Sequence, residues 1–297
     1  QSILERRQNN GPVMRRATRW LVYQYCRRNP VPWGKVKLLY LTRRWEVPHL
    51  EEARLPNGTR IMADLSDAVT RLIYFLGYYE PGVTKVITQV LRPGDTFVDV
   101  GAHVGYFSLL ASTCVGPTGK VHSFEPMPEV FASLEKNVEL NGRDNIRTCR
   151  AAIFDEEKEL EIFLPVAGNS GTATFFRRPN APGASISCPA ISLDSYAERE
   201  GIENIRLIKM DIEGAEPFAL RGMARLLSSP HPPAIICEAV PYLLKFSGHE
   251  QRDIFRILES HGYQGRRITD DGLAEFDFDG RQSPTTDCNL YFSRGDP

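Results

Sequence analysis

Residues 96–108 read TFVDVGAHVGYFS, and no other stretch of the chain constrains the fold as strongly. The apolar run 97–100 is typical of a buried strand, and a glycine-rich turn then leads into an apolar pattern of helical spacing. In an α/β sheet such a turn lies at the carboxyl end of its strand, where ligands bind. We expect Gly101 and Gly105 to let the backbone approach a ligand, because glycine has no Cβ to clash with it. Asp99, at the strand end, is expected to accept hydrogen bonds from that ligand.

The spacing of this turn indicates which ligand it takes. A dinucleotide fingerprint reads G-x-G-x-x-G, whereas residues 99–105 read D-x-G-x-x-x-G and lack the middle glycine. The pattern resembles the first motif of class I methyltransferases, which bind S-adenosylmethionine. The next apolar run, 120–124, ends at Glu125, about one βαβ unit after Asp99. An acid at this second strand end holds ribose hydroxyls in such folds, so Glu125 is expected at the ribose.

Composition excludes several functional classes. The formal net charge is -1, so the chain as a whole has no bulk attraction for nucleic acid, and no nucleic-acid partner is expected. No apolar run approaches the roughly 20 residues that span a bilayer, and no signal peptide is visible. The six cysteines are scattered without a C-x-x-C pair, which is typical of free thiols in a reducing compartment rather than of a zinc site. These features favour a cytoplasmic protein.

Residues 1–63 differ from the rest of the chain, and we interpret them as an extension that precedes a methyltransferase domain at 64–297. Arginines and lysines are frequent in the first 50 residues and interleave with aromatic side chains over a predicted helix at 13–28. This helix could pack on the core, contact an anionic partner such as a membrane surface, or dimerise the protein, and the pattern leaves these alternatives open. Residues 51–63 predict a β-hairpin around an Asn-Gly turn.

Three further segments are candidates for the pocket that binds the methyl acceptor. The first is a loop in which aromatic residues precede a carboxylate, although a helix stop followed by a turn explains it equally well. The second is the stretch 158–192, which departs from a simple alternation and predicts extra strands at 160–163, 172–175 and 185–191 around a polar loop. The third is the predicted loop at 241–248, which follows another apolar strand that ends in an acid. The candidate substrate residues are Tyr79, Glu80, Asn169, Ser170 and Glu238.

A second cluster of chemistry-bearing residues reads KMDIEGAE at 209–216, where an apolar strand ends and a helix begins. Because the carboxyl ends of parallel strands converge at one sheet edge, Asp211 is expected near the ligand of the first two strand ends. Asp211 or Glu213 could orient or deprotonate a substrate hydroxyl, or bind a divalent metal such as Mg that does so. Glu216 is assigned mainly to the helix N-terminus, whose dipole it stabilises.

Several segments together resemble the FkbM family of S-adenosylmethionine-dependent methyltransferases. They are GYYEP at 77–81, FVDVGAHVGYFS at 97–108, FEPMPEVFASLEKNVELNG at 124–142, GNSGTA at 168–173, ISLDSY at 191–196, LIKMDIEGAE at 207–216 and IICEAVP at 235–241. The resemblance implies a class I, Rossmann-like methyltransferase fold: a central, mostly parallel seven-stranded sheet with helices on both faces, plus a β excursion. It also implies O-methylation of a small molecule, commonly a sugar, glycolipid or polyketide.

The resemblance assigns roles to the matching residues. The expected cofactor-binding residues are Asp99, Gly101, His103, Gly105, Tyr106, Glu125, Pro126 and Ala152, the last at the end of a predicted third strand over 145–152 and beside the adenine. The expected catalytic residues are Asp211, Glu213 and His103, although the place of His103 in the glycine turn favours cofactor binding. The family pattern does not fix which residue is the general base.

The remaining methyltransferase types fit the sequence less well. The fourth strand is not followed by the Asn/Asp-Pro-Pro-aromatic stretch that marks amino methylation of bases, and Cys188-Pro189 has the wrong order for a cytosine-C5 nucleophile. Methyl transfer to a hydroxyl is an in-line displacement, in which the enzyme positions the hydroxyl and removes its proton. Two alternatives stay open: a non-catalytic binding module that kept the fold, and a methyltransferase that acts on a macromolecule.

Overall fold

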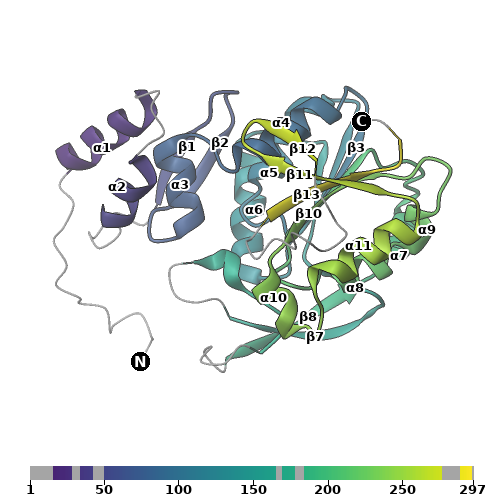
Figure 1. Cartoon of the computed structure of the whole chain (residues 1–297). Helices are drawn as coiled ribbons and strands as arrows, with labels where there is room; N and C mark the ends of the chain where they lie inside the picture. The colour runs from purple at the N-terminus through teal and green to yellow at the C-terminus, as the bar shows by residue number, and fades with distance from the viewer. Residues whose placement is uncertain are drawn as a thin grey trace. The chain divides into compact units, whose positions relative to one another are not determined.

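The computed structural model describes residues 16–28, 34–42, 50–164, 169–177, 184–275 and 288–295. The chain forms two compact units, Gln1–Tyr79 and Glu80–Pro297 (Figure 1). The predicted division after residue 63 therefore lies earlier in the chain than the division between the units. Residues 13–15 of the predicted first helix and Gly168 of the GNSGTA segment lie outside the described residues.

The described residues of the first unit form three helices and a β-hairpin. They are α1 (Arg16–Arg28), α2 (Lys35–Thr42), β1 (Leu50–Arg54), β2 (Arg60–Asp64) and α3 (Ala68–Leu76). The predicted hairpin is confirmed, since β1 and β2 pair antiparallel and the Asn57 side chain accepts a hydrogen bond from the Thr59 N–H at 3.1 Å. The helices share a small apolar core made by Cys26, Leu39 and Phe75.

The second unit is built on an eight-stranded sheet with the order β12-β11-β13-β10-β9-β3-β4-β5. Its strands are β3 (Thr96–Val100), β4 (Lys120–Phe124), β5 (Ile146–Cys149), β9 (Leu207–Met210), β10 (Ala234–Ala239), β11 (Gln264–Thr269), β12 (Gly272–Ala274) and β13 (Cys288–Ser293). The five strands from β10 to β5 run parallel, whereas β13, β11 and β12 join by antiparallel pairing. The mostly parallel class I sheet is thus confirmed, with one strand more than the seven expected, because the short strand β12 pairs with β11.

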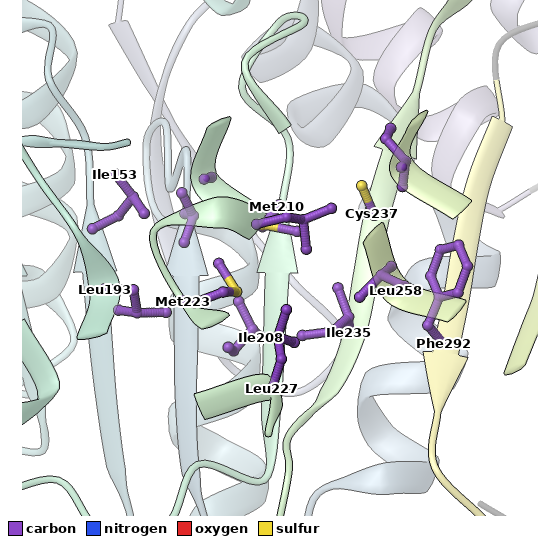
Figure 2. Packing of buried hydrophobic residues seen from close by; sticks show 14 of the residues in the cluster. Ile153, Leu193, Ile208, Met210, Met223, Leu227, Ile235, Cys237, Leu258 and Phe292 are labelled. Atoms are coloured by element: carbon purple, nitrogen blue, oxygen red, sulfur yellow. The ribbon is translucent and has the colours of Figure 1, made fainter. Parts of the chain in front are cut away.

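Helices cover both faces of this sheet (Figure 1). They are α4 (Pro81–Val90), α5 (Tyr106–Val115), α6 (Pro128–Leu140), α7 (Leu193–Glu200), α8 (Glu216–Arg221), α9 (Ala224–Leu227), α10 (Pro241–Phe246) and α11 (Gln251–Ser260). The core on one face is shown in Figure 2, where Ile208 and Ile235 from the parallel strands lie among Leu227 of α9 and Leu258 of α11. None of the helices within the described ranges combines the length and the apolar character needed to cross a bilayer.

The β excursion is confirmed as a separate three-stranded sheet with the order β6-β8-β7. Its strands are β6 (Ala152–Ile153), β7 (Lys158–Phe163) and β8 (Ser185–Ile191). Two predictions in this region were wrong in detail. The third strand of the main sheet ends at Cys149, and Ala152 belongs to β6. The strand predicted at 172–175 is reduced to a single bridge between Phe163 and Thr174, preceded by a 3₁₀ turn at Ser170–Thr172.

Candidate functional site

The sheet topology brings the predicted acidic residues to one edge. After β3 the chain winds outward to β4 and β5, and it later returns to place β9 and β10 on the other side of β3. The order therefore reverses between β3 and β9, and ligands of open α/β sheets bind outside the carboxyl ends of the strands at such a point. Asp99 lies in β3, Glu125 follows β4, Asp211 follows β9 and Glu238 lies near the end of β10.

The glycine turn after β3 packs tightly against the protein itself. Gly101 has a φ of 81°, and a Cβ at this position would collide with the backbone carbonyl of Asp211. Gly105 has a φ of 91°, and a Cβ there would lie 2.6 Å from Leu134 Cδ1 on α6. The missing Cβ atoms of these two glycines therefore make room for Asp211, which follows β9, and for Leu134 of α6. A contact with the cofactor stays a prediction for both.

His103 connects the glycine turn to two other predicted site residues. It has a φ of 51°, and its backbone N–H donates to Glu125 Oε2 at 3.0 Å. Its Nε2 lies 2.6 Å from Ser170 Oγ in the β excursion. The second oxygen of Glu125 accepts from the Met127 N–H at 3.0 Å. Burial raises the pKa of Glu125 to about 7 in spite of the two backbone hydrogen bonds that act against this rise.

Asp99 is fully buried at the end of β3. Its Oδ2 accepts a hydrogen bond from Ser108 Oγ at 2.6 Å, and Ser108 in turn accepts one from Ser123 at 2.8 Å. Its Oδ1 is buried and has no hydrogen-bond partner among the described residues. Burial raises the pKa of Asp99 above its ordinary value, although the nearby Lys209 charge and the Ser108 hydroxyl act against this rise. A buried acceptor without a partner is a place where a ligand donor would be stabilised.

The carboxyl edge also carries a cluster of three half-buried acids, which we name the acidic cluster: Glu80, Asp211 and Glu238. One carboxylate oxygen of each lies within 4.8 Å of the others. Lys209 lies two positions before Asp211 in the chain, and its Nζ is 3.2 Å from Asp211 Oδ2. Its side chain is only 3% exposed and its ammonium lies 4.9 Å from the centre of the Phe107 ring. The cluster therefore has a buried internal cation.

The charges of the acidic cluster follow from these contacts. Burial favours the neutral form of Asp211, but the Lys209 ammonium and hydrogen bonds from Lys209 and Glu238 hold the pKa of Asp211 below its ordinary value. Burial and the Asp211 charge raise the pKa of Glu238 well above its ordinary value. Burial and the same charge raise the pKa of Glu80 to about 7. The cluster thus combines an Asp211–Lys209 ion pair with two carboxyl groups, Glu80 and Glu238, whose pKa values are raised.

Spacing alone would allow the acidic cluster to hold a divalent cation, but its donor set does not fit one. Asp211 already has the buried Lys209 ammonium, 3.2 Å away, as its counter-charge. A metal ion that binds Asp211 would have to displace this ammonium. Glu213, the second predicted metal ligand, does not belong to the group of acids that come close enough within the described ranges.

Glu213 and Glu216 lie in the turn after β9 and have different surroundings. Glu213 has a φ of 55°, and its carbonyl accepts a hydrogen bond from Thr174 Oγ1 at 3.2 Å. Glu216 is 2% exposed, and its Oε1 accepts from the Ile212 N–H at 3.0 Å and from the Gly214 N–H at 3.4 Å. The structural assignment of Glu216 agrees with these contacts, because the carboxyl group holds the turn that precedes α8.

Replacing Glu216 with glutamine tests how far burial raises the pKa of this carboxyl group. The pKa of Glu216 is raised from 4.5 to about 7 by burial, so the folded protein binds this proton more tightly than the unfolded chain. The stabilisation is complete below pH 4.5 and is lost as the pH rises through 7. We expect the free energy of unfolding of the wild type, relative to Glu216→Gln, to fall by about 2–3 kcal/mol over this range. Urea denaturation of both proteins tests this, and a pH-independent difference would contradict it.

The other predicted site residues are spread over different surroundings. Tyr79 ends the first unit, so it is not placed relative to the acidic cluster. Tyr106 is buried at the start of α5, with its hydroxyl 3.4 Å from Thr84 Oγ1. Ala152 is buried against Met127 and Ala215 in the core beneath the β excursion. The remaining two lie in half-buried loops: Pro126 and Asn169.

Lys209 is the residue that the sequence analysis missed. It stands inside the run Leu207–Met210, which was interpreted as an apolar strand that only leads to Asp211. A lysine in a strand that is otherwise apolar was the available signal, since a buried lysine needs a carboxylate partner. The strand period of two places its side chain on the same face as the side chain two positions later, which is Asp211.

Comparisons with known proteins show which family this chain is similar to. The Methyltransferase FkbM domain matches residues 99–264. The 31-O-demethyl-FK506 methyltransferase FkbM of Streptomyces tacrolimicus is 29% identical over 201 residues, which cover 59% of this chain and 76% of that protein. The hexuronic acid methyltransferase of Haloferax volcanii is 26% identical over 151 residues, which cover 50% of this chain and 59% of that protein.

Among solved structures, Methyltransferase FkbM from Methylobacillus flagellatus aligns with 76% of this chain and 52% of its own, at 17% identity and a TM-score of 0.43. The family match is the stronger finding, since it takes in more than half of the chain. It begins at Asp99, ends at Gln264, and includes both the glycine turn and the strand that leads to Asp211. The chain therefore belongs to the FkbM family of S-adenosylmethionine-dependent methyltransferases.

Proposed function

We propose that this chain transfers a methyl group from S-adenosylmethionine to a hydroxyl of a small molecule of the sugar, glycolipid or polyketide type. The observation that carries the proposal is the juxtaposition, at one sheet edge, of the Asp99–Glu125 turn with the acidic cluster. The first is suited to a nucleoside with an amino acid tail and the second to a hydroxyl group. A 31-O-demethyl-FK506 and a hexuronic acid, the compounds in the names of two relatives, support an acceptor of this size and chemistry.

The residues of the glycine turn suit the cofactor. Asp99 offers a buried acceptor, Oδ1, that has no partner among the described residues and could take a hydrogen bond from an ammonium group. Glu125 has two oxygens at the end of β4, each of which can accept a further hydrogen bond from a ribose hydroxyl. When bound, S-adenosylmethionine supplies a methyl group on a positively charged sulfonium. We assign Asp211 to the acceptor hydroxyl, which its 26% exposed side chain can orient by accepting a hydrogen bond.

Replacing Glu125 with alanine is expected to weaken the binding of S-adenosylmethionine by about 1–3 kcal/mol, because the ribose hydroxyls lose a charged acceptor. The demethylated product should lose a similar amount, since it carries the same ribose. Isothermal titration calorimetry of both ligands measures the effect. Glu135→Ala, on the exposed face of α6, is a matched control that should leave both affinities unchanged. Equal affinities for the wild type and Glu125→Ala would contradict the ribose assignment.

The proposed transfer does not depend on a divalent metal, because Lys209 already supplies the positive charge of the acidic cluster. We expect EDTA at millimolar concentration to change the initial rate by less than about twofold, and added Mg²⁺ to have no larger effect. The rate is measured as formation of the demethylated cofactor. A loss of more than tenfold with EDTA that Mg²⁺ reverses would restore the metal-dependent alternative.

The proposal itself is tested by a screen of hydroxyl acceptors with isotopically labelled S-adenosylmethionine. Methylated glycosides, glycolipids or polyketides in the product mixture would support it, and their identity would name the acceptor class. Tight cofactor binding without turnover over a broad panel would favour the non-catalytic binding module instead. Labelling of protein or nucleic acid alone would favour a macromolecular acceptor.

The cellular location of the protein and the partners of its N-terminal segment are also part of the proposal. All six cysteines are free thiols, which supports a reducing, cytoplasmic location. The contact of the basic N-terminal segment with a membrane surface or a second copy stays a prediction. On α1, Trp20, Leu21 and Tyr25 are exposed, which is compatible with either partner.

A further inference from the structure

Glu80 starts α4 in a conformation that is unusual for a helix start. Its backbone has φ 42° and ψ 73°, which is the left-handed region that side chains other than glycine rarely occupy. Its side chain makes no capping hydrogen bond to the helix. The backbone conformation costs free energy, and residues that keep such strain cluster at functional sites.

The side chain of Glu80 turns to the acidic cluster instead. Its carboxylate lies within 4.8 Å of those of Asp211 and Glu238. Its Oε2 is buried without a hydrogen-bond partner among the described residues, while the Asn289 side chain on β13 hydrogen-bonds to the carboxyl group. The charged groups that face it are Lys209 and Asp211 from β9 and Glu238 from β10. Glu80 therefore has an acceptor oxygen that none of its described neighbours uses.

Its two neighbours in the acidic cluster are poorer proton acceptors. Asp211 is paired with Lys209 and accepts a hydrogen bond from Glu238, which makes its carboxylate a weak base. Burial and the Asp211 charge raise the pKa of Glu238 well above its ordinary value, which favours its protonated form. The Nε2 atom of His103 is hydrogen-bonded to Ser170 Oγ. The pKa of Glu80, raised to about 7 by burial and by Asp211, is near the value at which a general base is most effective at neutral pH.

We propose that Glu80 is the general base that takes the proton of the acceptor hydroxyl, an inference that rests on the proposed function. The acceptor oxygen forms a bond to the methyl carbon, and the carbon–sulfur bond breaks with its electron pair left on sulfur. The hydroxyl proton passes to the carboxylate of Glu80. The positive charge on sulfur and the negative charge on Glu80 disappear in the same reaction, so the half-buried site gains no net charge. Lys209 acts as a positioning residue that keeps Asp211 ionised beside the hydroxyl.

Proton release from Glu80 on cofactor binding can be measured without an acceptor. A bound sulfonium favours the ionised form of Glu80, so S-adenosylmethionine should release a proton from it, whereas the demethylated product carries a neutral sulfur and should not. With a pKa of about 7 in the free protein, the difference at pH 7 is about half a proton per site. Proton release from Glu125 cancels in this difference, because both ligands carry the same ribose.

The experiment is isothermal titration calorimetry of the whole chain at pH 7 in two buffers of different ionisation enthalpy, with both ligands. We expect S-adenosylmethionine to release about half a proton more than its product from the wild type and from Glu80→Asp, which keeps the carboxylate. Glu80→Gln should show no difference between the ligands. Glu216→Gln is the matched control: its carboxyl has a pKa that burial also raises to about 7, but it holds backbone N–H groups, so the difference should persist.

Two results would overturn the inference. One is a ligand difference that survives in Glu80→Gln, which would place the responsive group elsewhere, and the other is no difference in the wild type. Failure of the wild type to bind S-adenosylmethionine would instead overturn the proposed function, and the inference with it.

Once an acceptor is known, Glu80→Gln should lower kcat by at least about 10²-fold and remove the rise of kcat/KM through pH 7, with the KM for the cofactor little changed. An unchanged pH profile would exclude Glu80 as the base.

Discussion

Replacing Lys209 with methionine is expected to lower the free energy of unfolding by about 3–5 kcal/mol at pH 8. The lysine side chain is 3% exposed, with its ammonium 3.2 Å from Asp211 and 4.9 Å from the centre of the Phe107 ring. Methionine has a similar length and can keep the contact with the ring, so the substitution removes mainly the charge. Three acids that now share this cation, Asp99, Asp211 and Glu80, would then lie together without a counter-charge.

The pH dependence separates this effect from a general packing defect. At pH 5 the acids can take up protons when the lysine is absent, so the loss in Lys209→Met should be smaller than at pH 8. Lys158→Met is the matched control, because Lys158 also pairs with two acids, at 2.9 and 3.0 Å, and lies 4.6 Å from an aromatic ring centre. Its side chain is 31% exposed, so its removal should cost about 0–1 kcal/mol. Equal losses in the two variants would mean that Lys209 is not needed to keep the acids ionised.

The parallel half of the sheet and its ligand edge could be predicted because they are encoded locally. An apolar run of strand length that ends in an acid occurs at Asp99, Glu125 and Asp211, and the order of a doubly wound sheet then brings such ends to one edge. The same logic placed Glu238 at the edge. These predictions needed only the alternation of strands and helices along the chain.

The composition of the acidic cluster could not be predicted in the same way. Tyr79 and Glu80 are neighbours in sequence and were given the same role, yet the division between the compact units falls between them. Glu80 has a left-handed backbone conformation, and its carboxylate lies close to those of Asp211 and Glu238. No local sequence pattern predicts this backbone conformation at a glutamate. Its contact with Asn289 joins residues more than 200 positions apart in the chain.

Several short elements were missed for a different physical reason. Strand β12 has three residues and exists because it pairs with β11, so its sequence, Gly272–Ala274, carries no strand signal of its own. Helix α2 reads KVKLLYLT, in which the apolar residues at 38–41 follow one another and do not form a single apolar face. Helix α10 forms at Pro241–Phe246, where the sequence predicted a loop. Tertiary contacts decide such segments, and propensity is then only a weak guide.

Replacing Asp211 with asparagine is expected to lower kcat by at least about 10²-fold while the affinity for S-adenosylmethionine changes by less than about threefold. The side chain keeps its size but loses the charge that accepts from Lys209, from Glu238 and, in the proposed reaction, from the acceptor hydroxyl. The cofactor contacts assigned to Asp99 and Glu125 are untouched, which is why binding should survive. Single-turnover kinetics and calorimetry separate the two effects.

Replacing Glu213 with glutamine compares the contribution of this carboxylate to kcat with that of Asp211 in the same turn. Glu213 does not belong to the acidic cluster, so its replacement should lower kcat by less than about tenfold. If Glu213→Gln were as slow as Asp211→Asn, the acceptor would have to lie nearer the β excursion, where the Glu213 carbonyl bonds Thr174. If Asp211→Asn kept full activity, orientation of the hydroxyl by Asp211 would be excluded, and Glu80 would have to act with its pKa raised by burial but not by the Asp211 charge.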